Sequence, residues 1–391
     1  MNNTTSSLDA SRLLATRMDA IDASGIRRAF ELGATIKNPI NLSIGQPHYA
    51  VPEEMKDAAI AAIREDKHGY TVTQGIPALH DSIERHLLHD VGWSRERNEY
   101  DIIVTSGTSG ALFLAAMALL GEGDEAIIPD PYFVIYPQLG PMTGGRMVLC
   151  DTYPDFRMTA ERIEPLINAK TKFVLLNSPS NPAGVVLSKE ELADVVALCR
   201  AKGVLLLSDE IYDEFVFSDA AEADGTCPSP ARVSEDVLLV RGFGKTHGCT
   251  GWRLGYAAGP PWLIAEMRTL QQYTFVCAPT PLQWGVIPAF GRDSSGQVAA
   301  YQRRRDRVLA AIEPYTEVAT PGGAFYAFFE VPPSLNLSDQ AFVELAAKER
   351  VLLVPGSVFS ARSTHVRLSF TVEDDLLDEG LAIVARLLQG A

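Results

Sequence analysis

The sequence predicts an α/β protein, in which a large domain with a mostly parallel sheet sandwiched by helices is followed by a smaller α+β domain. Two patterns carry this prediction. Short apolar runs, bounded by polar residues, glycine or proline, alternate with stretches of helical periodicity. After the turn region 291–297 the pattern changes to a charged helical stretch, two apolar runs and further helices. Because uninterrupted apolar runs suit strands buried on both faces, the alternation indicates parallel strands joined by right-handed helical crossovers.

The large domain is expected to contain four buried strands with helices between them. The four strand predictions are Ile102–Thr105, Phe173–Leu176, Val204–Leu207 and Val237–Val240. Residues 189–200 form an amphipathic stretch that opens at Ser188 with Glu191 three residues on, the spacing of a capping box. The most apolar run, 111–120, is shorter than the roughly 18–20 residues of a membrane span, so we interpret it as a buried helix.

The C-terminal part predicts a smaller unit. A charged helix is expected over 301–312, and apolar runs follow at 324–331 and 366–370. We find no repeat, low-complexity tract or long linker in the sequence, so the units are expected to pack against each other as rigid bodies. We expect an N-terminal segment, 1–44, that packs with the small domain, a large domain over 45–290 and a small domain over 291–391.

Composition and charge restrict the partners. The chain has 391 residues, 47% hydrophobic and 21% charged, the proportions of an ordinary folded protein. With 34 basic and 49 acidic residues its formal net charge is −15, a field that repels nucleic acid and acidic membrane surfaces, so we expect neither partner. Five scattered cysteines without a Cys-x-x-Cys pair, and an N-terminus without a legible secretory signal, indicate the cytoplasm.

Polar groups follow the first two predicted strands. Residues 106–110, Ser-Gly-Thr-Ser-Gly, lead from a strand into a helix. Their hydroxyls and the helix N-terminus suit a phosphate, although a plain turn with a hydroxyl cap explains them as well. Residues 177–184, Asn-Ser-Pro-Ser-Asn-Pro-Ala-Gly, form a preset loop after the second strand. That loop either presents the Asn181 amide to a ligand or is an ordinary turn.

The other two strands lead to groups with clearer chemistry. Asp209, with Tyr212 three residues on, follows the third strand, where a buried carboxylate must cap a helix or pair with a cation or a protonated ring. Lys245 follows the fourth, between Gly244 and Thr246. An enclosed lysine near a cation such as Arg253 has a lowered pKa and can form a Schiff base, whereas most lysines are solvated. Since ligands bind at the carboxyl ends of the strands in such sheets, these groups together predict one active site.

In combination the segments resemble a known family. They are Ser-Gly-Thr-Ser-Gly-Ala-Leu at 106–112, Asn-Ser-Pro-Ser-Asn-Pro-Ala-Gly at 177–184, Asp-Glu-Ile-Tyr at 209–212, Lys245 with Arg253, and Arg-Leu-Ser-Phe at 367–370, preceded by Ser-Gly-Ile-Arg at 24–27 and Leu-Ser-Ile-Gly-Gln-Pro at 42–47. This order resembles the class I aminotransferases of fold type I, pyridoxal 5′-phosphate enzymes such as aspartate, aromatic and kynurenine aminotransferases. The resemblance spans nearly the whole chain and implies amino transfer from an L-amino acid to a 2-oxo acid by a ping-pong mechanism.

The resemblance implies a role for each residue that contacts the coenzyme ring. Lys245 would form the Schiff base and move the substrate proton. Asp209 would pair with the pyridinium nitrogen and keep the ring protonated as an electron sink. Asn181 and Tyr212 would hydrogen-bond the phenolic oxygen of the ring, and Phe133 would stack on its face. Of these, Lys245, Asp209 and Tyr212 form the expected catalytic set.

The resemblance also implies a phosphate site and a substrate site. The phosphate would be held by Gly107, Thr108, Ser109 and Arg253, with Tyr70 reaching it from a partner subunit, so a homodimer with shared active sites is expected. Arg367 would bind the substrate α-carboxylate with both arms of its guanidinium, a task that lysine performs poorly. Gly45 would let the backbone approach the substrate, and Asn181 belongs to this site too.

Three positions depart from the family pattern. Gly242 and Gly244 stand where the family often has serine, which removes a hydroxyl from the phosphate site, and Cys249 stands where an aliphatic residue is usual. A lyase that eliminates a β or γ sulfur group, or a synthase, would carry the same motifs and stays the alternative. A ligand-sensing regulator built on this fold would carry a basic DNA-binding domain ahead of it, which the acidic charge and about forty preceding residues disfavour.

The sequence says less about which substrate side chain is bound and about metal binding. A dicarboxylate substrate needs a second cation, for which Arg27, Arg28 or an arginine of the partner is available. His86 and His89 lie one helical turn apart near Asp90, but the sequence has no His-Glu-x-x-His or Cys-x-x-Cys spacing. We interpret these histidines as helix-surface residues and expect no catalytic metal.

Overall fold

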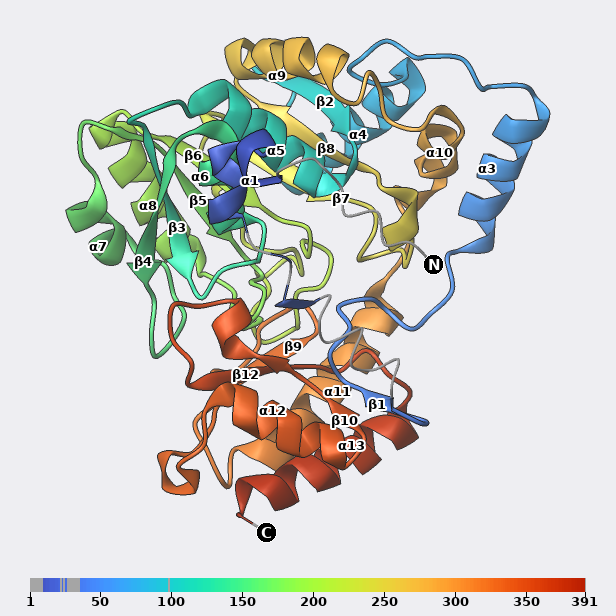
Figure 1. Cartoon of the computed structure of the whole chain (residues 1–391). Coiled ribbons are helices and arrows are strands. Elements are labelled where there is room, and N and C mark those ends of the chain that lie inside the picture. The colour runs from blue at the N-terminus through green and yellow to red at the C-terminus, as the bar shows by residue number, and fades with distance from the viewer. Residues whose placement is uncertain (1–9, 22, 24, 27–35, 98, 391) are drawn as a thin grey trace, which may run out of the picture.

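The computed structural model describes residues 10–21, 23, 25, 26, 36–97 and 99–390, which form an upper and a lower body in Figure 1. The described helices are α1 (Ala10–Leu13), α3 (Glu53–Arg64), α4 (Pro77–Asp90), α5 (Gly107–Leu119), α6 (Tyr136–Thr143), α7 (Ala160–Ile163), α8 (Lys189–Lys202), α9 (Pro261–Tyr273), α10 (Thr280–Gly285), α11 (Ser295–Ile312), α12 (Asp339–Lys348) and α13 (Asp374–Leu388). Among them no helix is both long and apolar enough to cross a membrane.

A seven-stranded sheet forms the centre of the upper body as described. Its order is β2 (Asp101–Thr105), β8 (Gly255–Gly259), β7 (Val237–Gly242), β6 (Leu205–Asp209), β5 (Thr171–Asn177), β3 (Glu125–Asp130) and β4 (Arg146–Asp151). All neighbouring strands are parallel except β8, which is antiparallel to β2 and to β7. The predicted α/β class with a mostly parallel sheet is therefore confirmed.

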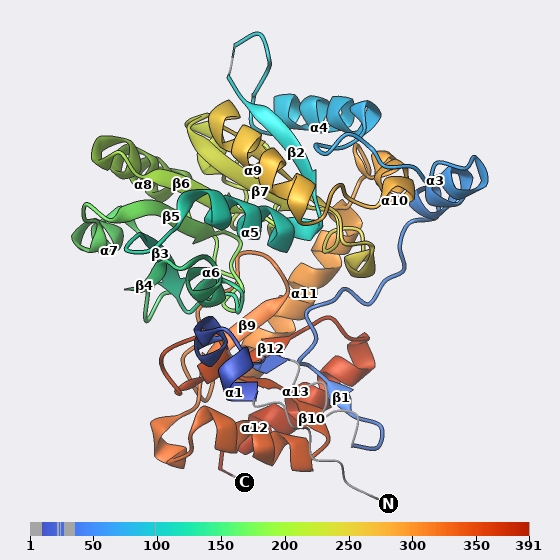
Figure 2. The same cartoon turned by 45° about the horizontal axis from the view of Figure 1, so that its top comes forward.

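Alternating residues of the strands bury both faces of this sheet. On one face, Ile103, Leu238 and Val240 pack against residues of α5, α6 and α9. On the other, Leu206 and Val237 pack against α7 and α8, and neighbouring strand residues pack against α3 and α4. Figure 2 shows α5 and α9 over the first face and α3, α4 and α10 at one side. The sheet is thus sandwiched by helices, and its strand ends are fixed from both sides.

The helix predictions agree with these layers. α8 begins after Ser188, whose Oγ accepts from the backbone N–H of Glu191 at 3.3 Å, while the Glu191 carboxylate accepts from the backbone N–H of Ser188 at 2.7 Å. The predicted capping box is therefore confirmed. The apolar run 111–120 lies in α5, where Ala111, Leu112 and Leu114 are buried, as expected of a core helix.

The lower body holds the second part of the chain. Strands β11 (Val354–Pro355), β12 (His365–Ser369) and β9 (Tyr326–Glu330) form an antiparallel sheet in that order. Helices α11 and α12 pack against it, and α13 packs against these two helices (Figure 1). β1 (Ile40–Asn41) pairs in parallel with β10 (Val351–Leu352) and so attaches an N-terminal segment to this body. Arg367 and Tyr326 of the lower body contact Asn181 and Tyr212, which follow β5 and β6 at the carboxyl edge of the large sheet.

Candidate active site

Nine of the predicted residues line one cavity at the carboxyl edge of the large sheet. Because β8 runs against its neighbours, Arg253 at its start lies at the same edge as the ends of β2, β5, β6 and β7. The cavity measures about 130 Å³. Its lining includes the predicted residues Gly107, Thr108, Ser109, Phe133, Asn181, Asp209, Tyr212, Lys245 and Arg253, together with Tyr136, Asn177, Ile211, Gly244, Thr250 and Leu254.

Asp209 is a buried carboxyl at the end of β6. Its Oδ2 accepts a hydrogen bond of 2.8 Å from Tyr136 Oη, and its Oδ1 accepts from the backbone N–H of Ile211 at 3.3 Å. Burial raises the pKa of Asp209 from 3.8 to about 6, although the Tyr136 hydrogen bond opposes that rise. It forms no ion pair with any residue of the described ranges. Such a carboxyl favours a cationic ligand, because a positive group would offset the cost of its burial.

The amine of Lys245 enters the same cavity. Its Nζ donates to the backbone carbonyl of Gly45 at 2.5 Å and lies 5.9 Å from the ring centroids of Tyr212 and Phe325. A side chain at position 45 would meet Tyr326 Oη at 2.1 Å from its Cβ, so only glycine lets the backbone come this close. The lysine is therefore held against a carbonyl and two aromatic rings instead of extending into solvent.

Tyr212 is a buried phenol beside this amine. Its Oη lies 3.0 Å from Tyr326 Oη. Burial, reinforced by the neighbouring Tyr326 phenol, raises the pKa of Tyr212 well above the usual 10. The group consequently keeps its proton at neutral pH and remains a hydrogen-bond donor.

A second buried cation lies at the edge of the cavity. Arg367 on β12 donates from Nη1 to Asn181 Oδ1 at 3.0 Å and from Nη2 to the Ser43 carbonyl at 2.8 Å, and its Nε is buried without a hydrogen-bond partner. Its guanidinium stacks 4.6 and 4.5 Å from the ring centroids of Tyr326 and Phe359. Burial lowers its pKa, and no carboxylate of the described ranges pairs with it. An anionic ligand would complete this site.

The turn after β2 lies against Arg253, and Gly107, Thr108, Ser109 and Arg253 together form a surface that we call the phosphate cup. Thr108 and Ser109 lie in the first turn of the thirteen-residue helix α5, and Arg253 Nη1 donates to the Thr250 carbonyl at 3.2 Å. Gly107 has a φ of +68°, and a Cβ there would lie 2.8 Å from Arg253 Nη2. The backbone must approach the guanidinium closely, which leaves N–H groups, hydroxyls and a cation together, a combination that binds anions.

Gly242 and Gly244 are closely packed. A Cβ at Gly242 would lie 2.8 Å from Ile211 Cδ1 and 3.1 Å from Thr108 Cγ2, and one at Gly244 would lie 3.2 Å from Thr250 Cα. The space beside both glycines is therefore already occupied by side chain or backbone. The cup relies on its remaining hydroxyls, those of α5 and Thr250.

Three predicted site residues, Tyr70, Gly45 and Arg367, are not part of the cavity lining, and several residues that contribute to the site were missed. Tyr70 is 88% exposed and does not line this cavity, and Gly45 contributes through its carbonyl. Sequence reasoning missed Tyr136, Tyr326 and Asn177. The Asn177 side chain donates to the Asp209 carbonyl at 2.9 Å and accepts from the Asn181 N–H at 2.8 Å. Asn177 belongs to the loop motif already noted, and Tyr136 comes three residues after Phe133 at the start of α6. In contrast, no sequence signal distinguishes Tyr326.

Other candidate groups add little to the site. Arg27 and Arg28 lie outside the described residues. Burial lowers the pKa of His247 to about 4, so its imidazole is neutral at physiological pH. Within the described ranges no cluster of three or more His, Cys, Asp or Glu residues is arranged to hold a metal ion.

Comparisons with known proteins relate the whole fold to one family. The family model for aminotransferase class I and II matches residues 37–384. The chain is 34% identical to a putative aminotransferase of Bacillus subtilis over 385 residues, which cover 96% of this chain and 98% of that protein. It is 32% identical to a probable aspartate aminotransferase of Methanocaldococcus jannaschii over 390 residues, or 96% and 100% of the two chains. The aspartate aminotransferase of Thermus thermophilus, solved with maleate, superposes with a TM-score of 0.88 at 32% identity and coverage of 96% and 99%.

Proposed function

The chain belongs to the class I and II aminotransferases, which are pyridoxal 5′-phosphate enzymes, and from that premise we propose how its cavity moves an amino group from an L-amino acid to a 2-oxo acid. When bound, the coenzyme supplies an aldehyde for the substrate amine and a protonated ring that withdraws electrons from the substrate α-carbon. The two half-reactions alternate at one site, so the kinetics are ping-pong.

Both charged ends of the coenzyme fit the residues present. The unpaired Asp209 carboxyl would hold the pyridinium nitrogen, since a cation offsets its burial. At the other end the cup of Gly107, Thr108, Ser109 and Arg253 would hold the phosphate. Between the ends, Phe133 would stack on the ring, while Asn181 and Tyr212 would hydrogen-bond its phenolic oxygen.

The reacting groups of the chain act on the substrate. Arg367 would bind the α-carboxylate with both arms of its guanidinium, and this fixes the rotation about the bond to Cα. The Cα proton would then leave perpendicular to the ring, and Lys245 Nζ would accept it and deliver it in the next step. Tyr212, which keeps its proton, would remain a donor throughout.

One observation carries this proposal: the amine of Lys245 and the buried carboxyl of Asp209 line a single cavity. The test adds amino acids singly to the purified enzyme loaded with coenzyme, while the coenzyme absorption and the 2-oxo acid are followed. At least one donor is expected to convert the coenzyme to its amine form, and borohydride is expected to trap the coenzyme on Lys245.

The matched control for this test is Lys245→Ala. Because general acid–base catalysis contributes about 10²–10⁴-fold, this variant is expected to lose at least that factor in turnover. If no amino acid yields a 2-oxo acid or the amine form, the proposal fails. Release of ammonia or thiol without an acceptor acid would instead identify an eliminating lyase.

We also propose that the enzyme is a homodimer with shared active sites. An exposed apolar surface, here called the Tyr70 patch, consists of Tyr70, Val72, Tyr273, Phe275 and Val276. Hydrogen bonds from Thr280 Oγ1 to the Gly69 carbonyl and from Gln271 Nε2 to the Thr73 carbonyl join its two segments. Phe275 lies within 3.8 Å of the position of a Cβ on Gly110 in α5. An apolar patch beside the phosphate cup supports a partner that reaches into the site.

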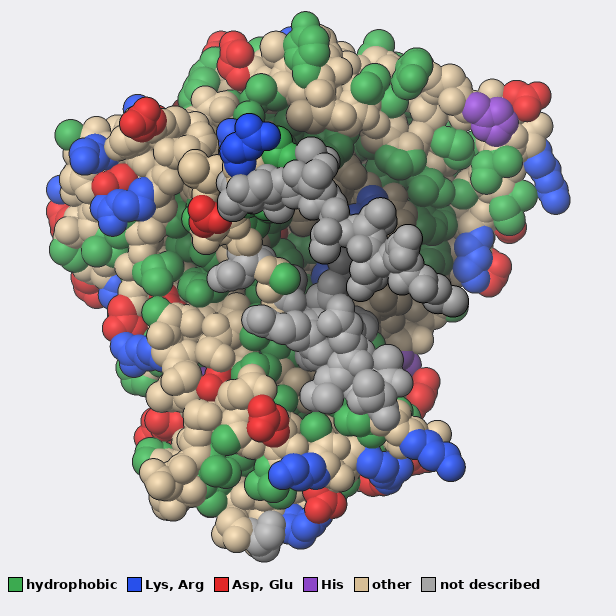
Figure 3. Space-filling view, viewed as in Figure 1, with side chains coloured by type: hydrophobic (Ala, Val, Ile, Leu, Met, Phe, Trp, Pro, Cys, Tyr) green, Lys and Arg blue, Asp and Glu red, His purple; other side chains and the backbone are tan. Residues whose placement is uncertain are grey.

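Three smaller proposals complete this picture. We propose that the chain divides into an N-terminal segment (1–44), a large domain (45–290) and a small domain (291–391), which the separate sheets support. We propose a cytoplasmic location, which five free cysteines support. We also propose that nucleic acid and membranes are not partners. The net charge supports this, as do the interspersed acidic and basic side chains among described residues on the face in Figure 3.

A further inference from the structure

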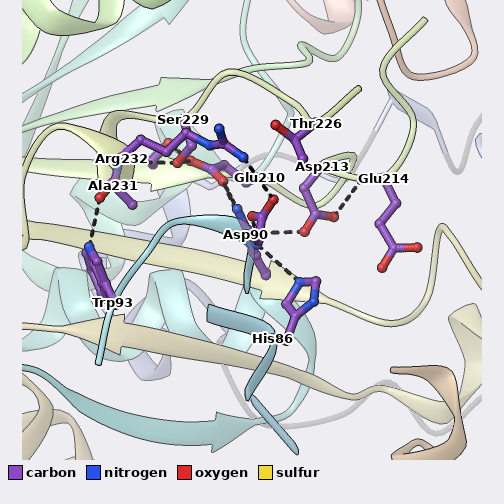
Figure 4. A network of polar contacts seen from close by, with 12 residues as sticks. His86, Asp90, Trp93, Glu210, Asp213, Glu214, Thr226, Ser229, Ala231 and Arg232 are labelled. Carbon is purple, nitrogen blue, oxygen red and sulfur yellow. Dashed lines mark hydrogen bonds and ion pairs between the residues drawn. The ribbon is translucent and has the colours of Figure 1, made fainter. Parts of the chain in front are cut away.

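One buried arginine contacts both ends of the turn that carries Tyr212. Arg241 on β7 is 1% exposed. Its Nη2 lies 2.8 Å from Glu210 Oε2, its Nε 3.2 Å from Asp213 Oδ2 and its Nη1 2.6 Å from Asp90 Oδ2. Figure 4 shows these three carboxylates converging. Glu210 and Asp213 begin and end the turn, so a single guanidinium joins its two ends.

The backbone places the turn between this cluster and the cavity. Glu210 donates its N–H to the Val240 carbonyl at 2.8 Å, which continues the pairing of β6 with β7. Consecutive side chains of an extended chain point to opposite faces, so Asp209 faces the cavity while Glu210 faces Arg241. The turn then closes with a bond of 3.1 Å from the Asp213 N–H to the Glu210 carbonyl.

The remaining oxygen of Glu210 is bonded as well. Its Oε1 accepts from Ser208 Oγ at 2.8 Å and from Ser229 Oγ at 2.7 Å. This carboxylate is thus fixed by two hydroxyls on one side and by Arg241 on the other. Because this buried carboxylate is fully hydrogen-bonded, it restricts the movement of the backbone at Glu210.

We propose that Arg241 is a positioning residue for the coenzyme site. It fixes the Glu210–Asp213 turn, and with it the Tyr212 phenol and the Asp209 carboxyl, relative to Lys245, which follows Arg241 by four residues on the same segment. The inference rests on the function proposed above, because the contacts it positions are those to the coenzyme. Arginine suits this task because its planar fork reaches two carboxylates in fixed directions, whereas lysine is a single point charge.

The charges of the cluster show which variant tests the proposal. Burial raises the pKa of Asp213 to about 7 and that of Glu214 to about 8, and the Arg241 charge opposes both shifts. His86 is not the helix-surface residue that we expected from the sequence. It lies 3.3 Å from Arg241 Nη1, and burial and that charge lower its pKa to about 4. A neutral residue at position 241 would leave buried carboxylates without their cation and disturb folding itself. Arg241→Lys keeps the positive charge and removes only the planar guanidinium that reaches two carboxylates at once.

In the test, apoprotein of Arg241→Lys is titrated with coenzyme and the absorption of the bound coenzyme is followed against pH. We expect the Kd of the coenzyme to rise about tenfold. The pH at the midpoint of the absorption change is expected to rise by about one unit, because a displaced Tyr212 no longer donates a hydrogen bond to the ring oxygen. The control is Arg232→Lys, which alters the outer arginine, bonded to Asp90 and Asp224 but not to the turn. It is expected to keep the native Kd and midpoint.

Hydrogen exchange of the apoproteins gives a readout that needs no coenzyme. The amides of Asp213 and Phe215, which bond to carbonyls within the turn at 3.1 and 2.8 Å, are expected to exchange faster in Arg241→Lys than in Arg232→Lys. Native exchange or a native pH midpoint would overturn the proposal. If Arg241→Lys does not fold, Asp213→Asn releases one end of the turn and is held to the same criteria. If the wild-type protein binds no coenzyme, the proposed function is wrong. The hydrogen-exchange comparison would still show whether Arg241 fixes the turn.

Discussion

At the scale of single residues, the buried carboxylate of Asp209 lowers the stability of the apoprotein but favours binding of a cation. In the unfolded chain its pKa is near 3.8, but in the folded apoprotein it is about 6, because burial disfavours the charge. Between these values the native state holds a proton that the unfolded state has lost, so stability falls as pH rises. Above about pH 6 both states are ionised and the whole cost of the buried charge remains. A cationic ring nitrogen would remove that cost.

Asp209→Asn is therefore expected to gain stability relative to wild type as pH rises. The difference in the free energy of unfolding between the two apoproteins should grow by roughly 2–3 kcal/mol from pH 4 to pH 7. Urea unfolding at several pH values measures it. The same variant should bind the coenzyme more weakly than wild type. A stability difference that does not change with pH would contradict the buried charge.

The site residues on the large sheet could be predicted from the order of the strands, whereas those of the lower body could not. Asp209 ends one strand and Lys245 comes three residues after the end of the next, so strand order alone brings them to one edge. Tyr326 and Arg367 come from the lower body and reach the cavity through tertiary packing between the two bodies. Strand-end reasoning therefore located the groups on the large sheet, while Arg367 was reached through the family resemblance and Tyr326 was not found.

At the scale of elements, the turn from β2 to α5 depends on Gly107. Its φ of +68° disfavours any side chain, and its Cβ position lies 2.8 Å from Arg253 Nη2. Gly107→Ala is expected to cost about 1–2 kcal/mol of stability from the left-handed backbone. It should also displace Arg253 and weaken coenzyme binding. Gly123→Ala is the matched control, since Gly123 has a φ of +88° with no atom within 4 Å of its Cβ position.

Comparing the two alanine variants separates strain from function. Both should lower the urea midpoint by similar amounts, but only Gly107→Ala should raise the Kd of the coenzyme for the apoprotein. Fluorescence titration measures that Kd. Equal Kd values in the two variants would show that close approach to Arg253 is unimportant for phosphate binding.

The elements found in the sequence are the ones whose own residues favour them. The four predicted strands correspond to β2, β5, β6 and β7, each rich in buried Leu, Ile or Val. β8, Gly-Tyr-Ala-Ala-Gly, was not predicted, because glycine and alanine have low strand propensity and its stability comes from pairing with strands on both sides. β3 includes Pro129 and was also missed. Local sequence thus identified four strands rich in Leu, Ile or Val, but not β8 and β3, which are also buried but carry glycine and alanine or a proline.

At the scale of the whole molecule, the proposed dimer makes a prediction about mixtures of two impaired variants. Tyr70 is exposed in its own chain, and the Tyr70 patch lies beside the phosphate cup. Lys245→Ala removes the amine, and Tyr70→Ala removes the side chain proposed to enter the partner's site. In a hybrid dimer the subunit with native Lys245 receives native Tyr70 from the other subunit, so one site is complete.

Mixing the two variants under conditions of subunit exchange should therefore give more activity than the mean of the separate parents. The matched control pairs Lys245→Ala with Arg253→Ala. Since Arg253 lines the cavity of its own chain, every hybrid site then lacks either the amine or the guanidinium, and no gain is expected. A gain in the control alone, or equal gains in both mixtures, would contradict a site shared through Tyr70. A gain confined to the Tyr70 mixture requires that Tyr70 serves the partner's cavity, because a residue acting within its own chain would leave both hybrid sites defective.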